Sequence, residues 1–347
     1  MRPRPLYTLH PTPLAVLYSD LENHAAVTQE VLIGTPGSVT ERENARGFRF
    51  YTRQFYDPSG KRRESYIGGP IGSEEAEERA ARVRAQVEET LRVAREVRLL
   101  GREGYQVADA RTYATLASLH NHGVFRAGAT LIGSHAFGAL LNQLGARAAA
   151  YSTEDVDIAR AEPLAFTEPP TASLLDMLKG SGVDFVEVPS QPAQPSTRWK
   201  EAGRSRFHVD LLVPSPDERF EIIAIPELKA HAQSVPYLRY LLGETQPSLL
   251  IAREGCCQVR TPTAERFAIH KVLVSQLRGA GATKGARDLA QAAALLAVIA
   301  ERTPGALAEA AARLPLSAGR QARAGFEALR AVLGEAHPRV WEELASL

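Results

Sequence analysis

Hydrophobic positions in the first third of the chain predict two helices on either side of a β-hairpin. Apolar residues recur at helical spacing from Leu14 to Leu32, and a Thr-Pro-Gly turn follows. Strict alternation over residues 48–55, a Pro-Gly turn and a polar return strand predict the hairpin. Ser73 and the acidic residues after it are typical of a helix N-terminus, and an Arg- and Glu-rich pattern extends that helix to about Leu100.

The rest of the chain first mixes strands with helices and then becomes entirely helical. Short apolar or alternating runs predict strands over 124–132, 155–158, 183–188, 207–213 and 221–225. Helical spacing predicts helices over 110–122, 134–144, 172–179, 263–277, 286–301, 305–313 and 320–333. We therefore expect an α+β fold in which a mixed sheet has flanking helices. We divide it into an N-terminal hairpin-plus-helix region (1–120), a central region (121–255) and an all-helical C-terminal region (256–347).

Composition narrows the class of protein. The 347 residues include 41 Lys plus Arg and 40 Asp plus Glu, and 44% are apolar, which is typical of a soluble globular protein. Near-zero net charge excludes a protein that coats nucleic acid by bulk electrostatics, although a local basic groove stays compatible with it. No apolar run approaches the roughly 18 residues of a membrane helix, and the Pro-rich start is unlike a secretory signal. Cys256 and Cys257 are adjacent and favour reduced thiols. We expect a cytoplasmic protein that does not bind a membrane.

One strand-to-helix junction is suited to an anion. Leu131 and Ile132 end a predicted strand, and Gly133 and Ser134 open a helix directly after it. Glycine lets a ligand approach the backbone, and the free N–H groups at a helix N-terminus attract phosphate. Many α/β turns carry Gly-Ser without binding a ligand, so this junction indicates a binding site only in combination with other motifs.

Three acidic residues follow at positions that strand geometry brings onto one face. Asp155 and Asp157 are two residues apart in a short predicted strand and therefore point to the same side. Asp210 interrupts the apolar run of a later strand, where a buried carboxylate needs a partner. Paired carboxylates repel each other, and a divalent cation such as Mg²⁺ is their natural partner. The alternative is a strand edge with solvated acids.

Together these residues resemble the nucleotidyltransferase superfamily typified by DNA polymerase beta. That pattern is Gly-Ser opening a helix, Asp-x-Asp on the next strand and a third Asp on a later strand, and the segment 133–159 resembles the bacterial branch of abortive-infection and related toxin enzymes. The resemblance, over about 121–300, implies a nucleotidyltransferase fold and metal-dependent chemistry. Asp155, Asp157 and Asp210 would be catalytic and hold Mg²⁺, with Mn²⁺ as the alternative, while Gly133 and Ser134 would bind the nucleotide.

Two lysines extend the resemblance into the helical region. The toxin branch carries a Lys, a basic segment and an Arg-Asp pair after its core, and here Lys271, Lys284, Arg287 and Asp288 follow that order. The resemblance implies that Lys271 and Lys284 contact the triphosphate, where a cation balances charge on the leaving group. Asp288 would instead orient Lys271 or Arg287. An exposed helix with a snorkelling lysine is the alternative.

The predicted hairpin and one loop carry basic residues mixed with aromatic ones. Seven basic residues lie between Arg42 and Arg63, interleaved with Phe and Tyr, a mixture that suits contact with nucleic acid. We assign acceptor binding to Arg49, Arg53, Arg62 and Arg63. The alternative is a strand pair that packs on the following helix while its arginines are solvated. A Pro-rich loop over 189–205 precedes Asp210 and carries a basic cluster with Trp199, so we expect it near the site; the cluster is Arg198, Lys200, Arg204 and Arg206.

The hypothesis from the sequence is an enzyme that transfers NMP from an NTP such as ATP to a hydroxyl acceptor and releases pyrophosphate. The basic hairpin favours an RNA or tRNA 3′ end as acceptor, and a protein or a small molecule is the alternative. The resemblance to the toxin branch implies an antitoxin partner. A further alternative is a non-catalytic nucleic-acid-binding protein that retains the fold, although binding alone does not require three converging acids.

Overall fold

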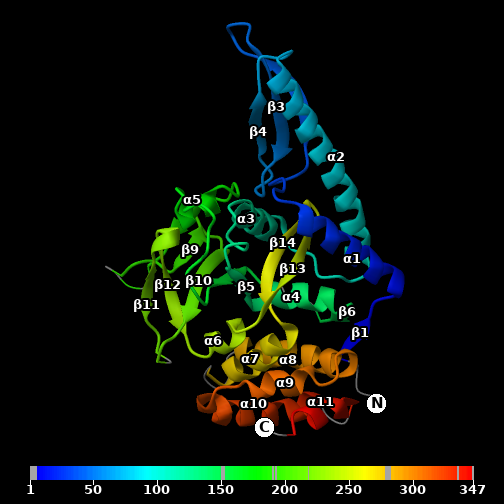
Figure 1. The fold of residues 1–347 in the computed structure, drawn as a ribbon, viewed down its shortest axis with the longest axis vertical. Coiled ribbons are helices and arrows are strands. Elements are labelled where there is room, and N and C mark those ends of the chain that lie inside the picture. Colours follow the sequence, from blue (N-terminus) through cyan, green and yellow to red (C-terminus); the bar gives the residue numbers. More distant parts are fainter. Residues whose placement is uncertain are drawn as a thin grey trace.

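A seven-stranded mixed sheet lies in the middle of the protein (Figure 1). The computed structural model describes residues 6–149, 153–189, 191, 194–217, 219–277, 283–333 and 336–345. The main path of the sheet is β11–β12–β10–β7–β5, with β9 beside the first half of β10 and β8 beyond β9. Its strands are β5 (Thr130–Ile132), β7 (Asp155–Ala159), β8 (Phe185–Glu187), β9 (Arg198–Glu201), β10 (His208–Pro214), β11 (Ile222–Ile225) and β12 (Ala230–Val235).

Strand β10 shows why the sheet forms at this position. It pairs in parallel with β7 on one side and with β12 on the other, while β5 runs antiparallel to β7. Side chains alternate between the faces of a strand, and Val209, Leu211 and Val213 are all buried. Asp210 lies on the opposite face, which leaves that face available for polar chemistry.

Helices and a β-hairpin cover the sheet. Helix α3 (Ala110–Asn121), helix α4 (Gly133–Gln143) and the hairpin of β13 (Thr245–Ala252) and β14 (Gly255–Pro262) pack together, with β14 against β5. Smaller elements join them, namely α5 (Leu174–Lys179), α6 (Leu238–Leu242) and a 3₁₀ turn at Pro226–Leu228. Cys256 and Cys257 are free and buried in β14, as the sequence indicates.

The C-terminal helices form a layer below the sheet in Figure 1. They are α7 (Ala264–Leu277), α8 (Thr283–Arg302), α9 (Ala306–Ala312), α10 (Gly319–Leu333) and α11 (Pro338–Glu343), with a 3₁₀ turn at Leu316–Ala318. The apolar run Ala292–Ala300 is buried on every side within α8. Within the described residues, no helix has the length and apolar character needed to cross a membrane.

An arm of one long helix and a three-stranded sheet projects from the body (Figure 1). Strands β2 (Ser38–Glu43), β3 (Arg49–Tyr56) and β4 (Arg62–Gly68) form an antiparallel sheet in that order. Buried Tyr51 packs with Ala76 and Ala80 of α2 (Glu74–Arg102). At the base, α1 (Thr12–Val27) lies beside α2, and β1 (Tyr7–Leu9) pairs with β6 (Ala146–Ala148).

The α+β fold class is confirmed, and most predicted elements occur within a few residues of their expected bounds. Three expectations about the elements that precede α4 need correction. Only residues 130–132 of the strand predicted over 124–132 are extended, because hydrogen bonds from Ala127 N to Gly123 O and from Ala129 N to Val124 O close turns before it. The N-terminal hairpin gains a third strand, β2. The first helix ends at Val27 rather than Leu32.

The main hydrophobic core includes residues from all three sequence regions, and two smaller clusters lie around α1, α2 and the arm. A single cluster of buried side chains extends from Tyr113 to Leu344 and therefore crosses both proposed boundaries, at 120/121 and 255/256. The second boundary also falls inside the β13–β14 hairpin, whose turn follows Ala252. The division into three regions stays a prediction about sequence character.

The arm contains one carboxylate that its own turn stabilises, and this makes a testable prediction. Asp57 accepts hydrogen bonds from the backbone of Ser59 and Lys61, both at 2.9 Å, and from Arg63 Nε at 2.8 Å. Burial opposes the charge, but the hydrogen bonds from Ser59, Arg63 and Lys61 outweigh it and lower the pKa of Asp57 to about 2.

Replacing Asp57 by Asn should lower the free energy of unfolding by about 2 kcal/mol at pH 7. Because the folded-state pKa is depressed, this contribution is present above about pH 4 and is lost as the pH falls toward about 2. Urea unfolding of wild type and variant at pH 7 and pH 3 measures it, with the exposed Asp20→Asn as control. An equal difference at both pH values would contradict the assigned role.

Candidate active site

The three acidic residues lie on one face of two neighbouring strands. In the parallel pairing of β7 with β10, Asp157 is opposite Asp210 and Asp155 is opposite His208. Register partners on adjacent strands point to the same side of a sheet. The structure therefore places Asp155, Asp157 and Asp210 together, as their spacing in the sequence predicts.

The strand-to-helix junction lies directly against these acids. Ile132, the last residue of β5, pairs with Asp157, and Gly133 begins α4 next to it. Gly133 has a φ of +70°, and a Cβ there would lie 2.1 Å from Asp157 Oδ2. Glycine is required at this position for two reasons, the left-handed backbone and the space that the carboxylate occupies.

Asp157 lies in an environment that disfavours its negative charge. Burial, followed by the negative charge of Asp210, raises the pKa of Asp157 to about 6, and the cation of Lys271 partly offsets this. Among the residues that the structure describes, none donates a hydrogen bond to the Asp157 carboxylate. A carboxylate in this setting favours either a proton or a bound cation.

Cationic side chains already hold the other two acids. Arg198 of β9 donates to both oxygens of Asp210, from Nε at 2.6 Å and from Nη2 at 2.7 Å. Lys284 of α8 donates to Asp155 Oδ2 at 3.2 Å. His208 Nε2 lies between the two, 3.4 Å from Asp155 Oδ1 and 3.7 Å from Asp210 Oδ2.

Lys271 lies deeper in the protein than the sequence indicated. Its Nζ donates to Asp288 Oδ1 at 2.6 Å and lies 5.5 Å from the centre of the Phe267 ring, and the side chains of both charged residues are almost fully buried. Asp288 therefore orients Lys271, one of the two options that the sequence left open. Lys271 is nevertheless close enough to the site for its charge to lower the pKa of Asp157.

The first turn of α4 borders a small cavity of about 270 Å³ that Ser134 and His135 help to line. Ser134 Oγ accepts a long hydrogen bond of 3.4 Å from Gln291 of α8. Burial lowers the pKa of His135 to about 4, so its imidazole is neutral at pH 7. Its Nε2 atom is buried and has no hydrogen-bond partner within the described part of the chain.

The chemistry of the three acids suits a hard divalent cation. Mg²⁺ prefers carboxylate oxygens, and Asp157 offers oxygens that no described donor occupies. Within the described ranges, however, no group of three or more His, Cys, Asp or Glu side chains is already arranged to hold a metal ion. Asp210 is paired with Arg198 and Asp155 with Lys284, so both ion pairs would have to open before the three carboxylates could share one cation.

A comparison with protein families supports the nucleotidyltransferase resemblance and does not extend to the toxin branch. A family model described as "Nucleotidyltransferase" matches residues 110–315, more than half of the chain. The chain belongs to this nucleotidyltransferase family. The matched segment includes the strand-to-helix junction, all three acids and both lysines of the site.

Two further comparisons add little to this family assignment. A solved structure of an antigenic nucleotidyltransferase-like protein from Paracoccidioides brasiliensis is 14% identical, with 66% of this chain and 91% of that chain covered and a TM-score of 0.37. That likeness is too distant to support an argument about the site. No curated protein matches the chain.

In this nucleotidyltransferase the four hairpin arginines that we assigned to acceptor binding are all engaged by the protein itself. Arg53 is buried, and it donates to the carbonyls of Ile33, Thr35 and Pro36. The other three, on exposed strand positions, pair with polar or acidic neighbours: Arg49 with Glu41, Arg62 with Gln54 and Arg63 with Asp57. They belong to the arm, and Arg53 fastens it to the preceding loop.

Sequence reasoning located the segment of Arg198 but missed its role. We expected residues 198–200 in a loop near the site, whereas they form strand β9, whose Arg198 is paired with Asp210. His208 was missed entirely. The signal available for His208 was its position two residues before Asp210 on the same strand, which puts both side chains on one face.

The strained carboxylate gives a prediction about stability in metal-free buffer. Because the folded-state pKa of Asp157 is raised, the free energy of unfolding of wild type should fall as the pH rises from about 4 to about 6, by up to about 3 kcal/mol. Asp157→Asn removes this loss, so the variant should be more stable than wild type at pH 7 and equal to it at pH 4. Urea unfolding in EDTA at both pH values measures the difference. A less stable variant at pH 7 would contradict it.

Proposed function

We propose that this nucleotidyltransferase transfers the NMP group of an NTP to an acceptor hydroxyl and releases pyrophosphate. The observation that carries the proposal is the Asp157 carboxylate, which lies beside Asp210, against Gly133, with no described donor. A purely structural acid would be hydrogen-bonded or replaced by a neutral residue. The same observation argues against a non-catalytic binding protein, since an unneutralised acid repels phosphate.

The residues divide into an acidic and a basic side. Asp155, Asp157 and Asp210 would hold Mg²⁺, or Mn²⁺, which when bound supplies positive charge to the triphosphate. The amide groups at the start of α4, at Gly133 and Ser134, provide donors for phosphate oxygens.

Lys284 and Lys271 would balance charge on the leaving pyrophosphate, but in different ways. Lys284 is exposed and rests on Asp155, so it can exchange that carboxylate for a phosphate oxygen. Lys271 is buried and ion-paired with Asp288, so it would act on the nucleotide through its electrostatic field. Direct contact with a phosphate would require this ion pair to open. We therefore place the direct nucleotide contact at Lys284 and treat Lys271 as the fixed positive charge behind it.

Asp210 is the acid that we assign to the acceptor side. Its two oxygens are held by Arg198, a residue whose side chain is about half exposed and which can move without disturbing the core. Release of Asp210 from Arg198 would leave a carboxylate next to Asp157, positioned to receive the proton of the attacking hydroxyl.

The acceptor and the biological setting are finer proposals. An RNA or tRNA 3′ end, a protein side chain and a small molecule all offer a hydroxyl. Resemblance to the toxin branch supports a toxin with an antitoxin partner, and it rests on the order of residues over 133–159 and 271–288. We favour a nucleic-acid acceptor because four exposed arginines line a large groove beside the site.

The experiment is a labelling reaction with each α-labelled NTP, Mg²⁺ and a cell lysate that is separated afterwards into RNA, protein and small molecules. Wild type should label one fraction, and Asp157→Asn should lower the rate at least about 100-fold, as removal of a charge-stabilising group does. Asp20→Asn, the same change on the exposed face of α1, is the matched control.

A second measurement tests metal binding without activity. Millimolar Mg²⁺ should raise the melting temperature of wild type and leave that of Asp157→Asn unchanged, because a ligand stabilises the state that binds it. Equal labelling by wild type and Asp157→Asn would refute the assigned catalytic residues. An equal Mg²⁺ shift in both proteins would refute the metal site.

A further inference from the structure

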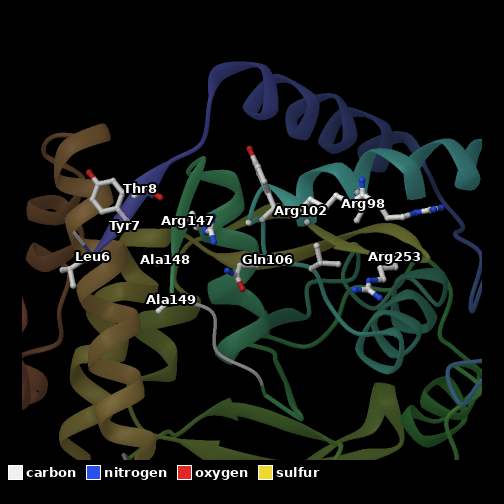
Figure 2. A pocket seen from close by; sticks show the side chains of 15 residues that line it. Leu6, Tyr7, Thr8, Arg98, Arg102, Gln106, Arg147, Ala148, Ala149 and Arg253 are labelled. Carbon is white, nitrogen blue, oxygen red and sulfur yellow. The ribbon is translucent and has the colours of Figure 1, made fainter. Parts of the chain in front are cut away.

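A large groove lies where the base of the arm meets the body. Its volume is about 1060 Å³, and four arginines from three separate segments line it: Arg98 and Arg102 of α2, Arg147 of β6 and Arg253 of the β13–β14 turn. We call it the arginine groove. Figure 2 shows Arg147 on the side of β1 and β6, and the other three on the side of α2.

The lining of the groove is positively charged. Within the described part of the chain none of the four guanidinium groups forms a salt bridge, and all four residues are exposed. No Asp or Glu is among the described residues that line the groove. Arg92 of the same helix, by contrast, is paired with Glu89 and Glu96. Four unpaired cations around one hollow are costly in self-repulsion unless an anion binds there.

The side chain of Arg147 packs closely against Gly104. Gly104 has a φ of +92°, and a Cβ at this residue would lie 2.6 Å from both Cδ and Nε of Arg147. The Arg147 side chain therefore lies flat against the backbone of the groove wall, where a larger residue would displace it.

The arginine groove adjoins the candidate active site. Gln106 and Val107 line both the groove and the 270 Å³ cavity, which reaches Ser134 and His135. The side chain of Asn142 fixes this junction, since its Oδ1 accepts from Gln106 N and its Nδ2 donates to Gln106 O, both at 2.8 Å. A chain held along the groove is thereby led toward the start of α4.

We propose that the arginine groove binds the phosphodiester backbone of a single-stranded nucleic acid whose terminal hydroxyl is the acceptor. This rests on the proposed nucleotidyl transfer. The guanidinium fork matches phosphate oxygens in geometry and charge. A groove of this size exceeds the needs of one nucleotide, which the start of α4 and Lys284 already serve. The hairpin arginines are satisfied within the arm, so the groove replaces them as the acceptor surface.

The test measures binding of a fluorescent single-stranded RNA and a DNA of the same sequence by anisotropy, without NTP. The groove variant changes Arg98, Arg102, Arg147 and Arg253 to Gln. Single-strand binding loses about 0.7 units of salt slope for each phosphate contact, so four contacts amount to about 3 units. Between about 50 and 200 mM salt, wild type should therefore weaken roughly 50-fold more than the groove variant.

Two control variants distinguish the loss of these four groove charges from the loss of charge elsewhere on the surface. Arg79, Arg239, Arg313 and Arg323 changed to Gln remove the same charge from other exposed surfaces and should leave the salt slope near that of wild type. Arg49, Arg62 and Arg63 changed to Gln test the arm. Should the fourfold groove variant fail to fold, the pairs Arg98 with Arg147 and Arg102 with Arg253 carry the test, each with half the change in slope.

The outcomes separate this inference from the proposed function. Wild-type slopes in the groove variant, or loss of binding in the arm variant instead, overturn the groove. Stronger competition by polyglutamate than by unlabelled RNA would also overturn the proposal, since it would identify an acidic protein as the ligand. A groove variant that loses RNA and DNA binding supports the inference, and stronger RNA binding identifies the acceptor class. If wild type then labels nothing with any NTP, the groove stands and the proposed transfer fails.

Discussion

The parallel pairing of β7 with β10 is the constraint on which the site depends. It sets Asp157 beside Asp210 and turns both away from the apolar face that the sheet buries. Like charges so close together repel each other, and burial makes the repulsion worse, as the raised pKa of Asp157 shows. The fold tolerates this because hydrophobic residues on the opposite face, such as Val156 and Val209, hold the two strands in register.

The surrounding elements support this arrangement in different ways. Arg198 arrives from β9, Lys284 and Asp288 from α8, and Lys271 from α7, so the C-terminal helices take part in the site as well as in the core. Gly133 contributes because it has no side chain, and a Cβ there would occupy the space of the Asp157 carboxylate. The site is thus a set of opposed charges held by packing, and in the proposed reaction the metal and the triphosphate would replace partners that are already present.

Much of the fold and the acidic centre could be predicted from local sequence. Strand periodicity put Asp155, Asp157 and Asp210 on one face, and capping and apolar spacing located the long helices. The predictions failed where long-range pairing overrides local pattern. Strand β9 follows a Pro-rich stretch and is extended because it pairs with β10, and strand β2 joins the predicted hairpin because it pairs with β3.

The sequence by itself determined the order of the candidate site residues and their strand parity, because side-chain alternation and helix capping act over a few residues, and it indicated the nucleotidyltransferase superfamily. The tertiary structure alone decided which charges meet. It paired Arg198 with Asp210 and Lys271 with Asp288, satisfied the arginines of the arm, and left Arg98, Arg102, Arg147 and Arg253 unpaired around one groove. Those four come from three segments that are far apart along the chain, and the charge that each one faces is a property of the folded surface.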